Sequence, residues 1–243
     1  MNRPIVICEN SFQIAWAQAI LALSDHNWNA WNLLLQIDHP ELYDKTTDDL
    51  LVSFAKKQKL ILPKHVAHTI FPQTFLKNNI SKDRLYEKYW RFFKMSRKMP
   101  HSGWGTYFER MIRYSTPKGD IDQLGSIIDN IKSRSRNYGA SYTMVIPYPH
   151  RDLNKLMGAP CLNYITIQVE KTETRKKINL LAVYRNHDFT ERAYGNYWGL
   201  CNLLKYIVQE TNCSMGTLTC VSSHAFVPKN REEIVAIANN ILG

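Results

Sequence analysis

The sequence lacks the features that mark membrane-spanning and secreted proteins. No run of about 18 apolar residues is present, so we expect no transmembrane helix. The apolar start at residues 5–8 meets Glu9 and Asn10 at once, and no small-residue cleavage site follows, so we expect no secretory signal. We therefore expect a cytoplasmic protein without a membrane partner.

Cysteine is scarce, and its spacing shows no pairing. The five cysteines are an odd number, and no two of them are separated by just two residues, which argues against a disulfide framework or a structural zinc site. We expect most of them to be small buried side chains and at most one to be chemically special. The sequence therefore predicts no bound metal.

The sequence also contains no low-complexity segment, internal repeat or Gly/Ser linker that would divide it. Its 243 residues, 44% of them hydrophobic, suffice for one large core and are too few for two ordinary domains. We expect a single domain over residues 1–243.

Positive charge is in excess. The net charge is +10, from 31 basic and 21 acidic residues, which favours anionic partners such as nucleotides and folates as well as nucleic acids. The basic residues stand in small scattered groups, and no zinc-finger, RNP or sustained basic-helix pattern accompanies them. The pattern therefore does not favour nucleic-acid binding.

Apolar periodicity predicts a mixture of helices and strands. The predicted helices cover about residues 11–23, 47–57, 82–94, 121–132, 196–210 and 231–242. The predicted strands cover about residues 31–37, 141–146, 161–169, 178–184 and 217–222. This mixture indicates an α+β domain with a large sheet.

Three segments of the second half carry polar residues in a distinctive order. Residues 158–162 (GAPCL) open a predicted strand, residues 185–188 (RNHD) begin 24 positions after Cys161, and residues 196–200 (NYWGL) open the long helix. Thymidylate synthases have Pro-Cys at the start of a strand, Arg-Ser-x-Asp on the next strand and an Asn at the core helix, at similar spacing. The chain resembles that family, which includes pyrimidine hydroxymethylases.

Further segments agree in the right order. Residues 184–200 and 216–222 resemble the short archaeal members of the family in particular. Glu87, three residues before Trp90, resembles the family's Glu-x-x-Trp helix, and Tyr107 resembles the tyrosine of its Tyr-Gly segment. The resemblance covers about residues 81–243, with a fainter match near the N-terminus.

The resemblance implies a thymidylate synthase-like α+β domain whose large mixed sheet is covered by helices. It implies a pyrimidine nucleotide as substrate, 5,10-methylenetetrahydrofolate as one-carbon donor, and a homodimer. The expected activity is methyl or hydroxymethyl transfer to C5 of a dUMP- or UMP-like base.

Cys161 is the expected nucleophile. Carbon C5 of a pyrimidine reacts poorly until a thiolate adds to C6, which makes an enolate able to attack a one-carbon donor. A neighbouring cation lowers a thiol pKa, and the resemblance assigns that place to Arg185. The alternative is that Cys161 is an inert core residue.

The resemblance makes Asn196 the residue that holds the pyrimidine edge. A carboxamide both donates and accepts, so it can pair with O4 and N3–H of uracil. Cytosine-directed relatives tend to carry Asp there, so Asn196 favours uracil; alternatively, it is an ordinary helix N-cap. Asp188 occupies the position that supports the arginine and the base-binding network, or is simply an acid at a strand end.

Glu87 and Tyr107 resemble the residues that manage protons through ordered water when the C5 hydrogen leaves. The alternative for Glu87 is a solvated helix charge, because basic residues surround it. His224 corresponds to the family's ribose-binding histidine only if one or two residues are deleted from the alignment. Phe226 then stands where a tyrosine is usual, and His224 is otherwise structural.

Two departures from the family keep other functions open. The family's Ser-Arg-Arg, which reaches the nucleotide phosphate of the partner subunit, is replaced at residues 137–142 by a stretch without arginine, so Lys132, Arg134 or Arg136 would have to substitute. The chain also ends soon after the closing helix, as short members do. The alternatives are a (d)CMP/(d)UMP hydroxymethylase for nucleoside or modified-base synthesis, or a catalytically degenerate nucleotide-binding protein.

Overall fold

The computed structural model describes residues 3–76, 80–96, 104–134, 142–153, 155, 158–173 and 175–243. The segment of residues 137–141, where the family's arginine pair is absent, and Arg136 lie outside the described residues. No helix in the described ranges has the length and apolar character needed to cross a membrane. The same ranges contain no group of three or more histidine, cysteine or acidic side chains that could hold a metal ion.

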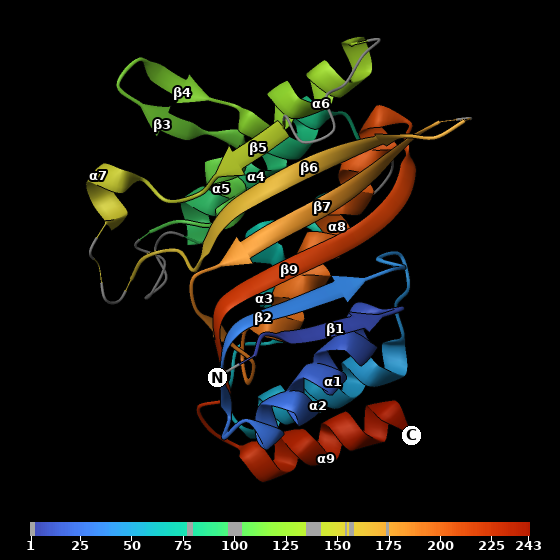
Figure 1. Cartoon of the computed structure of the whole chain (residues 1–243). Helices are drawn as coiled ribbons and strands as arrows, with labels where there is room; N and C mark the ends of the chain where they lie inside the picture. Colours follow the sequence, from blue (N-terminus) through green and yellow to red (C-terminus); the bar gives the residue numbers. More distant parts are fainter. Residues whose placement is uncertain are drawn as a thin grey trace.

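A seven-stranded mixed sheet forms the centre of the molecule (Figure 1). Its strand order is β1-β2-β9-β7-β6-β5, and the short β8 also pairs with β9. The strands are β1 (Ile5–Glu9), β2 (Asn29–Ile37), β5 (Tyr142–Val145), β6 (Leu162–Lys171), β7 (Lys176–Tyr184), β8 (His187–Asp188) and β9 (Ser214–Phe226). Pairing is parallel for β1·β2, β7·β9 and β8·β9 and antiparallel for β2·β9, β5·β6 and β6·β7. The predicted α+β fold with a large mixed sheet is confirmed.

Helices cover one face of this sheet, with α8 and α3 behind its central strands in Figure 1 and α1, α2 and α9 beside β1 and β2. The helices are α1 (Phe12–Asp25), α2 (Lys45–Lys57), α3 (Pro63–Ile70), α4 (Lys82–Ser96), α5 (Tyr107–Ile112), α6 (Gln123–Ser133), α7 (Pro149–Asp152), α8 (Ala193–Thr211) and α9 (Arg231–Leu242). A 3₁₀ turn, η1 (Gln73–Leu76), and a small hairpin of β3 (Tyr114–Thr116) and β4 (Gly119–Ile121) complete the described elements.

The opposite face of the sheet carries no described helix, and it is the face turned to the viewer in Figure 1. Leu34, Val221, Val183 and Tyr164 occupy paired positions on four neighbouring strands and form one row across it. Each of these side chains is only half-buried, whereas their neighbours along the strands face the core. A row of half-buried apolar side chains across an uncovered sheet is a surface suited to a second sheet.

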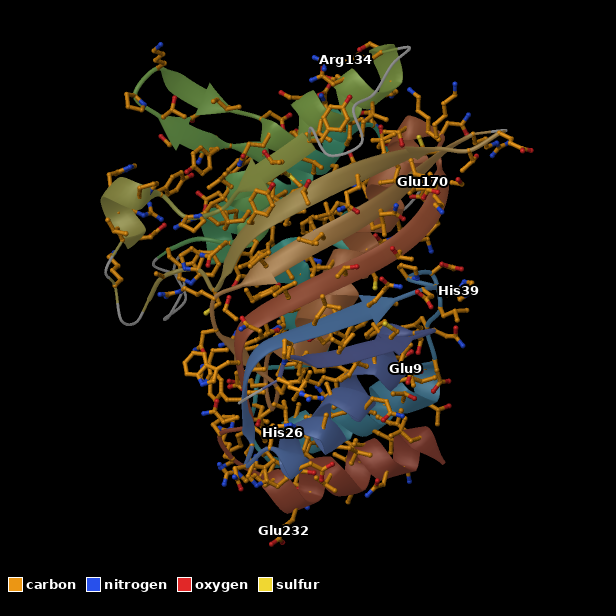
Figure 2. All side chains as sticks on the ribbon, viewed as in Figure 1. Glu9, His26, His39, Arg134, Glu170 and Glu232 are labelled. Carbon is orange, nitrogen blue, oxygen red and sulfur yellow. The ribbon has the colours of Figure 1, made fainter. Side chains whose placement is uncertain are left out.

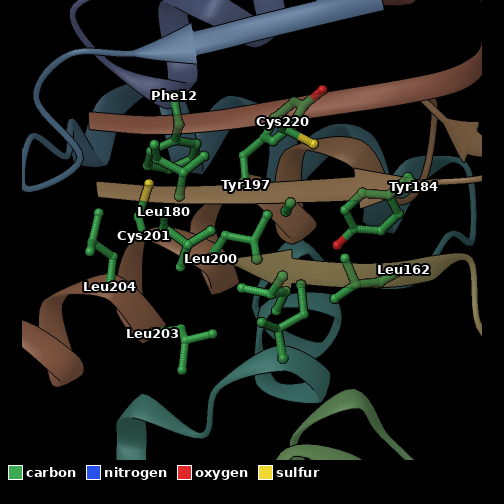
Figure 3. Close-up of a cluster of buried hydrophobic side chains, with 14 of the residues drawn as sticks. Phe12, Leu162, Leu180, Tyr184, Tyr197, Leu200, Cys201, Leu203, Leu204 and Cys220 are labelled. Atoms are coloured by element: carbon green, nitrogen blue, oxygen red, sulfur yellow. The ribbon is translucent and has the colours of Figure 1, made fainter. Parts of the chain in front are cut away.

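Helix α8 is the centre of the core. Most of its residues are buried, and it packs against the sheet and against α1, α3 and α6. Figure 3 shows Tyr197, Leu200 and Leu204 of α8 gathered with Leu180 and Tyr184 of β7. Full burial of one such side chain contributes about 1.5–3 kcal/mol to the free energy of folding. The position of α8 relative to the sheet is therefore strongly fixed.

Gly195 and Gly199 let α8 approach α3 closely. A Cβ atom at Gly195 would lie 2.6 Å from both the Pro63 carbonyl oxygen and the Val66 Cβ, and one at Gly199 would lie 2.8 Å from the Ala67 carbonyl oxygen. Real Cβ atoms do not approach that closely, so these two glycines allow the helix contact. The contact sets the position of the first turn of α8.

Replacing Gly195 by alanine should therefore destabilise the protein. We expect overpacking against α3 to outweigh the gain in helix propensity and to lower the free energy of unfolding by about 1–2 kcal/mol. Urea denaturation at one fixed protein concentration measures this, with Gln209→Ala on the exposed side of α8 as the matched control. Unchanged stability in Gly195→Ala would show that the contact with α3 is looser than described.

Candidate active site

A cavity of about 640 Å³ opens between the end of the sheet and helices α3, α4 and α8. One wall is polar and the other is mainly apolar and aromatic. The polar wall includes Cys161, Asn186, His187, Asp188, Arg192 and Asn196. The apolar wall includes Ile61, Val66, Tyr89, Phe92, Phe93 and Trp104. A site of this composition can bury a flat ligand and direct a few polar groups at its edge.

The hairpin of β6 and β7 brings Cys161 and Arg185 together. The two strands pair in antiparallel register up to Leu162 and Tyr184, so the residues just outside that pair face each other. The backbone N–H of Arg185 donates to the Cys161 carbonyl oxygen at 2.9 Å. Residues that stand 24 positions apart in the sequence are thus neighbours at one end of the sheet.

The side chain of Arg185 braces the loop that carries the cysteine. Its Nε donates to the Pro160 carbonyl oxygen at 3.2 Å, and an Nη donates to the Lys155 carbonyl oxygen at 3.5 Å. The positive charge of the guanidinium also favours the thiolate form of Cys161. Arg185 lies behind Cys161, since it is not among the residues that line the cavity.

Burial decides the protonation of Cys161 in this structure. Burial raises the pKa of the thiol, and the positive charges of Arg185 and Arg192 oppose that rise without cancelling it. Arg185 lowers the pKa of Cys161 in the expected direction, but the net pKa is raised because loss of solvent outweighs the nearby cations. The arginines reduce the cost of forming the thiolate but leave it above that of a free cysteine.

Asp188 shapes the turn between the sheet and α8. Its Oδ1 accepts hydrogen bonds from the backbone N–H groups of Thr190 (2.8 Å) and Glu191 (3.2 Å). Burial raises the pKa of the Asp188 carboxyl, although the two N–H donors oppose that rise. Asp188 also lines the cavity, so it combines a structural role in the turn with access to a ligand.

Asn196 lies in the first turn of α8 and is buried against the cavity. The alternative that it caps the helix is wrong, because α8 begins three residues earlier and the Asn196 N–H already donates to the Arg192 carbonyl oxygen at 2.9 Å. Its Nδ2 donates to Nε2 of His187 at 3.0 Å. None of the described residues donates a hydrogen bond to its Oδ1, which leaves this oxygen for a ligand.

Tyr107 reaches the same place from α5. Thr106 caps that helix, accepting from the Glu109 N–H at 3.1 Å, and so directs the first helical residue toward the cavity. The hydroxyl oxygen of Tyr107 accepts from the Cys161 N–H at 3.4 Å. Burial raises the pKa of Tyr107 to about 12, which keeps its own proton available for donation at neutral pH.

Glu87 does not reach the cavity. The core face of α4 carries Leu85 and Tyr89, and Glu87 lies on the other face with its side chain 58% exposed and paired with Arg91. The expectation of a catalytic Glu87 is therefore corrected. Its side chain is a solvent-exposed charge on the surface of α4, which was the alternative interpretation.

His224 lies one contact away from the cavity. Its Nδ1 is 2.6 Å from Oδ1 of Asn186, which lines the cavity, and its Nε2 is 2.9 Å from Oδ1 of Asn29. Its ring packs between those of Trp31 and Phe226 on the uncovered face of the sheet. His224 itself does not line the cavity, so it can influence a ligand only through Asn186.

Several polar residues that line the cavity were not predicted from the sequence, namely Asn186, His187, Arg192, Thr69, Thr106, His65 and His68. Arg192 lies four residues after Asp188 and four before Asn196, and this spacing at the start of a helix could have placed it beside Asn196. His187 lies between Arg185 and Asp188 in the sequence. Its contact with Asn196 becomes evident only from its buried position beside α8. Arg192 and His187 both bring groups to the site that the resemblance alone did not assign.

The candidates for phosphate binding divide into two groups. Lys132 and Arg134 lie at the C-terminal end of α6 and do not line the cavity; Figure 2 shows Arg134 there. Arg192 is the cation that lines the cavity among the described residues.

A buried ion pair holds the aromatic wall in place. Arg110 is fully buried and pairs with Asp152 of α7, and its Nη2 donates to the Trp104 carbonyl oxygen at 2.9 Å. The guanidinium also lies over the rings of Trp104 (5.3 Å) and Tyr148 (4.4 Å). Breaking a buried pair of this kind costs about 3–5 kcal/mol, so the position of Trp104 is strongly fixed.

Comparison with known proteins identifies this arrangement. The family model of thymidylate synthase matches residues 5–238. A putative thymidylate synthase of Methanosarcina mazei is 26% identical over 122 residues, which is 50% of this chain and 52% of that relative. Those of Methanosarcina barkeri and Methanococcoides burtonii are 25% and 23% identical, with the same coverage. The match thus spans about half the length of these curated relatives.

The family model extends over nearly the whole chain, well beyond the half that aligns with the relatives. It includes the β6–β7 hairpin with Cys161 and Arg185 and the start of α8 with Asn196. The resemblance drawn from the sequence is confirmed, and the chain belongs to the thymidylate synthase family.

Proposed function

We propose that the protein transfers a one-carbon unit to C5 of a uracil nucleotide, dUMP or UMP, through a covalent adduct between Cys161 and C6. The convergence of Cys161, Arg192 and the carboxamide of Asn196 on one cavity, with the charge of Arg185 behind the cysteine, carries this proposal. These groups supply a nucleophile, charge to stabilise its anion, and a donor–acceptor pair for the edge of the base.

In this mechanism the Cys161 thiol loses its proton and its sulfur bonds to C6. The electrons of the C5=C6 bond then move toward O4, giving an enolate. Asn196 holds the O4 and N3 edge, and Arg192, whose charge acts on Cys161, Tyr107 and Asp188 alike, stabilises the negative charge that develops. Carbon C5 would then bond to the one-carbon unit, the C5 proton would pass to a water molecule, and the bond between the unit and the folate nitrogen would break. Hydride from the folate, or hydroxide from water, would complete the methyl or hydroxymethyl group as the C5=C6 bond re-forms and the sulfur leaves as a thiolate.

Tyr107 is the proposed proton-managing group. Its oxygen already accepts from the Cys161 N–H, so its O–H is free to donate toward the ligand or a water molecule beside it. A hydroxyl with a pKa of about 12 stays protonated at neutral pH and therefore acts as a donor that orders this water.

The aromatic wall fits the family's one-carbon donor. Trp104, Phe92 and Phe93 line the same cavity as the polar residues, and flat aromatic surfaces of this kind stack on a pterin and an aminobenzoyl ring. Bound there, 5,10-methylenetetrahydrofolate supplies the one-carbon unit. The wall would exclude water from the reacting carbon, which strengthens the charge interactions around Cys161.

We further propose that the chain acts as one domain and as a homodimer. The buried apolar residues form a single continuous cluster that joins the sheet to its helices. The uncovered face of the sheet, with its half-buried row of Leu34, Val221, Val183 and Tyr164, would pack on the same face of a second copy.

Tritium release from C5 tests the proposed reaction. Incubated with [5-³H]dUMP and methylenetetrahydrofolate, the wild-type protein should release tritium, and Cys161→Ser should abolish release because no thiolate can add to C6. Cys213→Ser, outside the cavity, is the matched control and should retain release.

Three outcomes would contradict the proposal in different ways. Absence of release with any pyrimidine nucleotide would favour a nucleotide-binding protein. Release that survives Cys161→Ser would remove the nucleophile. Release with dCMP alone would overturn the preference for uracil.

The protonation of Cys161 gives a second prediction. Alkylation by iodoacetamide requires the thiolate, so its rate at Cys161 should rise with pH around a midpoint above the ordinary cysteine value. Arg185→Ala should move the midpoint further up, because a cation that favours the thiolate is lost, whereas Arg185→Lys should move it less. Peptide mass spectrometry measures the rate, with exposed Cys8 as the internal reference. A midpoint below the ordinary value would contradict the dominance of burial.

The dimer gives a third prediction. Leu181 stands on the uncovered face, paired with Thr219 of β9 and Thr166 of β6. Leu181→Lys should convert a dimer into a monomer, because a charge would be buried between the sheets without a partner. Light scattering after size exclusion measures the mass, with Gln209→Lys on the exposed side of α8 as control. A monomeric wild-type protein would refute the proposal.

A further inference from the structure

His187 lies at the centre of a buried polar chain that ends in the cavity. It is 1% exposed, and its ring stacks on Tyr184 with centroids 4.1 Å apart and planes at 4°. Its Nδ1 is 2.8 Å from Oγ of Ser222, and its Nε2 is 3.0 Å from Nδ2 of Asn196. Ser222 is fully buried and Asn196 is 4% exposed, so this chain of contacts is shielded from solvent.

The contacts select one tautomer of the imidazole. Burial lowers the pKa of His187 to about 3, so the ring is neutral at neutral pH and carries one N–H. Nδ2 of Asn196 is a donor, so Nε2 must be the acceptor and the proton must be on Nδ1. Nδ1–H then donates to Oγ of Ser222, a hydroxyl that can accept.

The orientation of the Asn196 carboxamide decides which of its sides donates a hydrogen bond and which accepts one. Rotation of the amide by half a turn exchanges its oxygen and its NH₂ group with almost no change of shape. Uracil presents an acceptor at position 4 and a donor at position 3, whereas cytosine presents a donor and an acceptor at the same positions. A freely rotating asparagine could therefore satisfy either base, and a fixed one satisfies only one of them.

We propose that His187 is the positioning residue that fixes Asn196 in one orientation and so makes the site select uracil over cytosine. This inference rests on the proposed function, and it assigns the base specificity to the Ser222–His187–Asn196 chain instead of to Asn196 alone. Turning the amide over would place its oxygen against the Nε2 lone pair, two acceptors 3.0 Å apart. The oxygen could face Nε2 only if the ring proton moved to Nε2 and the Ser222 hydroxyl turned to donate to Nδ1, so the three buried groups would have to change together.

The arrangement leaves the right atoms for the ligand. His187 takes one N–H of Asn196, and the second N–H and Oδ1 remain. The contact with His187 therefore uses one N–H of the carboxamide to fix its orientation, and the other N–H and the oxygen remain as a donor–acceptor pair for the base.

The tautomer can be read without any ligand. In the free protein, ¹⁵N NMR of the histidine ring at neutral pH should show His187 neutral and protonated on Nδ1, with the resonance assigned by comparison with His187→Phe. Protonation on Nε2 would overturn the inference, because Nε2–H would then face the Asn196 oxygen and the amide would have the opposite orientation.

Substitutions test the link to specificity. Ser222→Ala removes the acceptor that holds the Nδ1–H tautomer, and His187→Phe keeps the stacked ring but removes both nitrogen atoms. Calorimetric titration with dUMP and dCMP should show that the wild-type protein prefers dUMP and that each variant reduces the ratio of the two affinities roughly tenfold, the worth of about one hydrogen bond. Ser223→Ala, which removes the same hydroxyl from the next position of β9, should leave the ratio unchanged.

The ratio separates positioning from general damage, since a variant that merely loosens the site weakens both nucleotides together. An unchanged ratio in both Ser222→Ala and His187→Phe would overturn the inference even if each binds more weakly. A wild-type protein that binds neither nucleotide would contradict the proposed function. The tautomer of His187, measured by NMR, would then still test whether His187 fixes the orientation of Asn196.

Discussion

The pairing of β6 with β7 is the constraint on which the site depends. The antiparallel register ends at Leu162 and Tyr184, and the next hydrogen bond joins the Arg185 N–H to the Cys161 carbonyl oxygen. The chain then continues through β8, which pairs with β9, and turns at Asp188 into α8. The thiol of Cys161, the guanidinium of Arg185 and the carboxamide of Asn196, which we propose as nucleophile, cation and base-binding group, are thus positioned by one hairpin and one turn.

Burial and charge oppose each other throughout the cavity. Loss of solvent raises the pKa values of Cys161, Tyr107 and Asp188, and Arg192 opposes the rise at all three. Without a ligand these raised pKa values favour the protonated forms of the three groups, and forming the Cys161 thiolate costs free energy. A ligand that brings negative charge to C4 and expels water would interact strongly with the same cations.

The sequence predicted the fold class and the part of the site that depends on local order. Cys161, Arg185, Asp188 and Asn196 were assigned by their resemblance to motifs of the family, and apolar periodicity separately indicated the strands and the helix beside them. β1, α3 and α5 were not predicted, since each is short and its pattern is ambiguous. The predicted start of α8 at Asn196 was three residues late, because no side-chain cap marks Arg192.

The remaining errors concern which face a residue occupies. Glu87 matched a family spacing, yet the rotation of α4 about its axis is set by the packing of Leu85 and Tyr89, and this turns Glu87 to solvent. His187 was read only as part of a motif, because its partners Ser222 and Asn196 come from β9 and α8, far away in the sequence. Contacts of this kind follow from tertiary packing, which local patterns do not encode.

The central claim is that the sulfur of Cys161 bonds to C6 of a uracil nucleotide. The most direct test is intact-protein and peptide mass spectrometry after incubation with 5-fluoro-dUMP and methylenetetrahydrofolate, because fluorine at C5 cannot leave as a proton does and the adduct is trapped. The account predicts a protein mass increased by the nucleotide together with the whole methylenetetrahydrofolate, because the carbon unit cannot separate from the folate unless C5 loses a proton. The added mass should be on the peptide that contains Cys161. An unmodified protein, or an adduct on another residue, would contradict it.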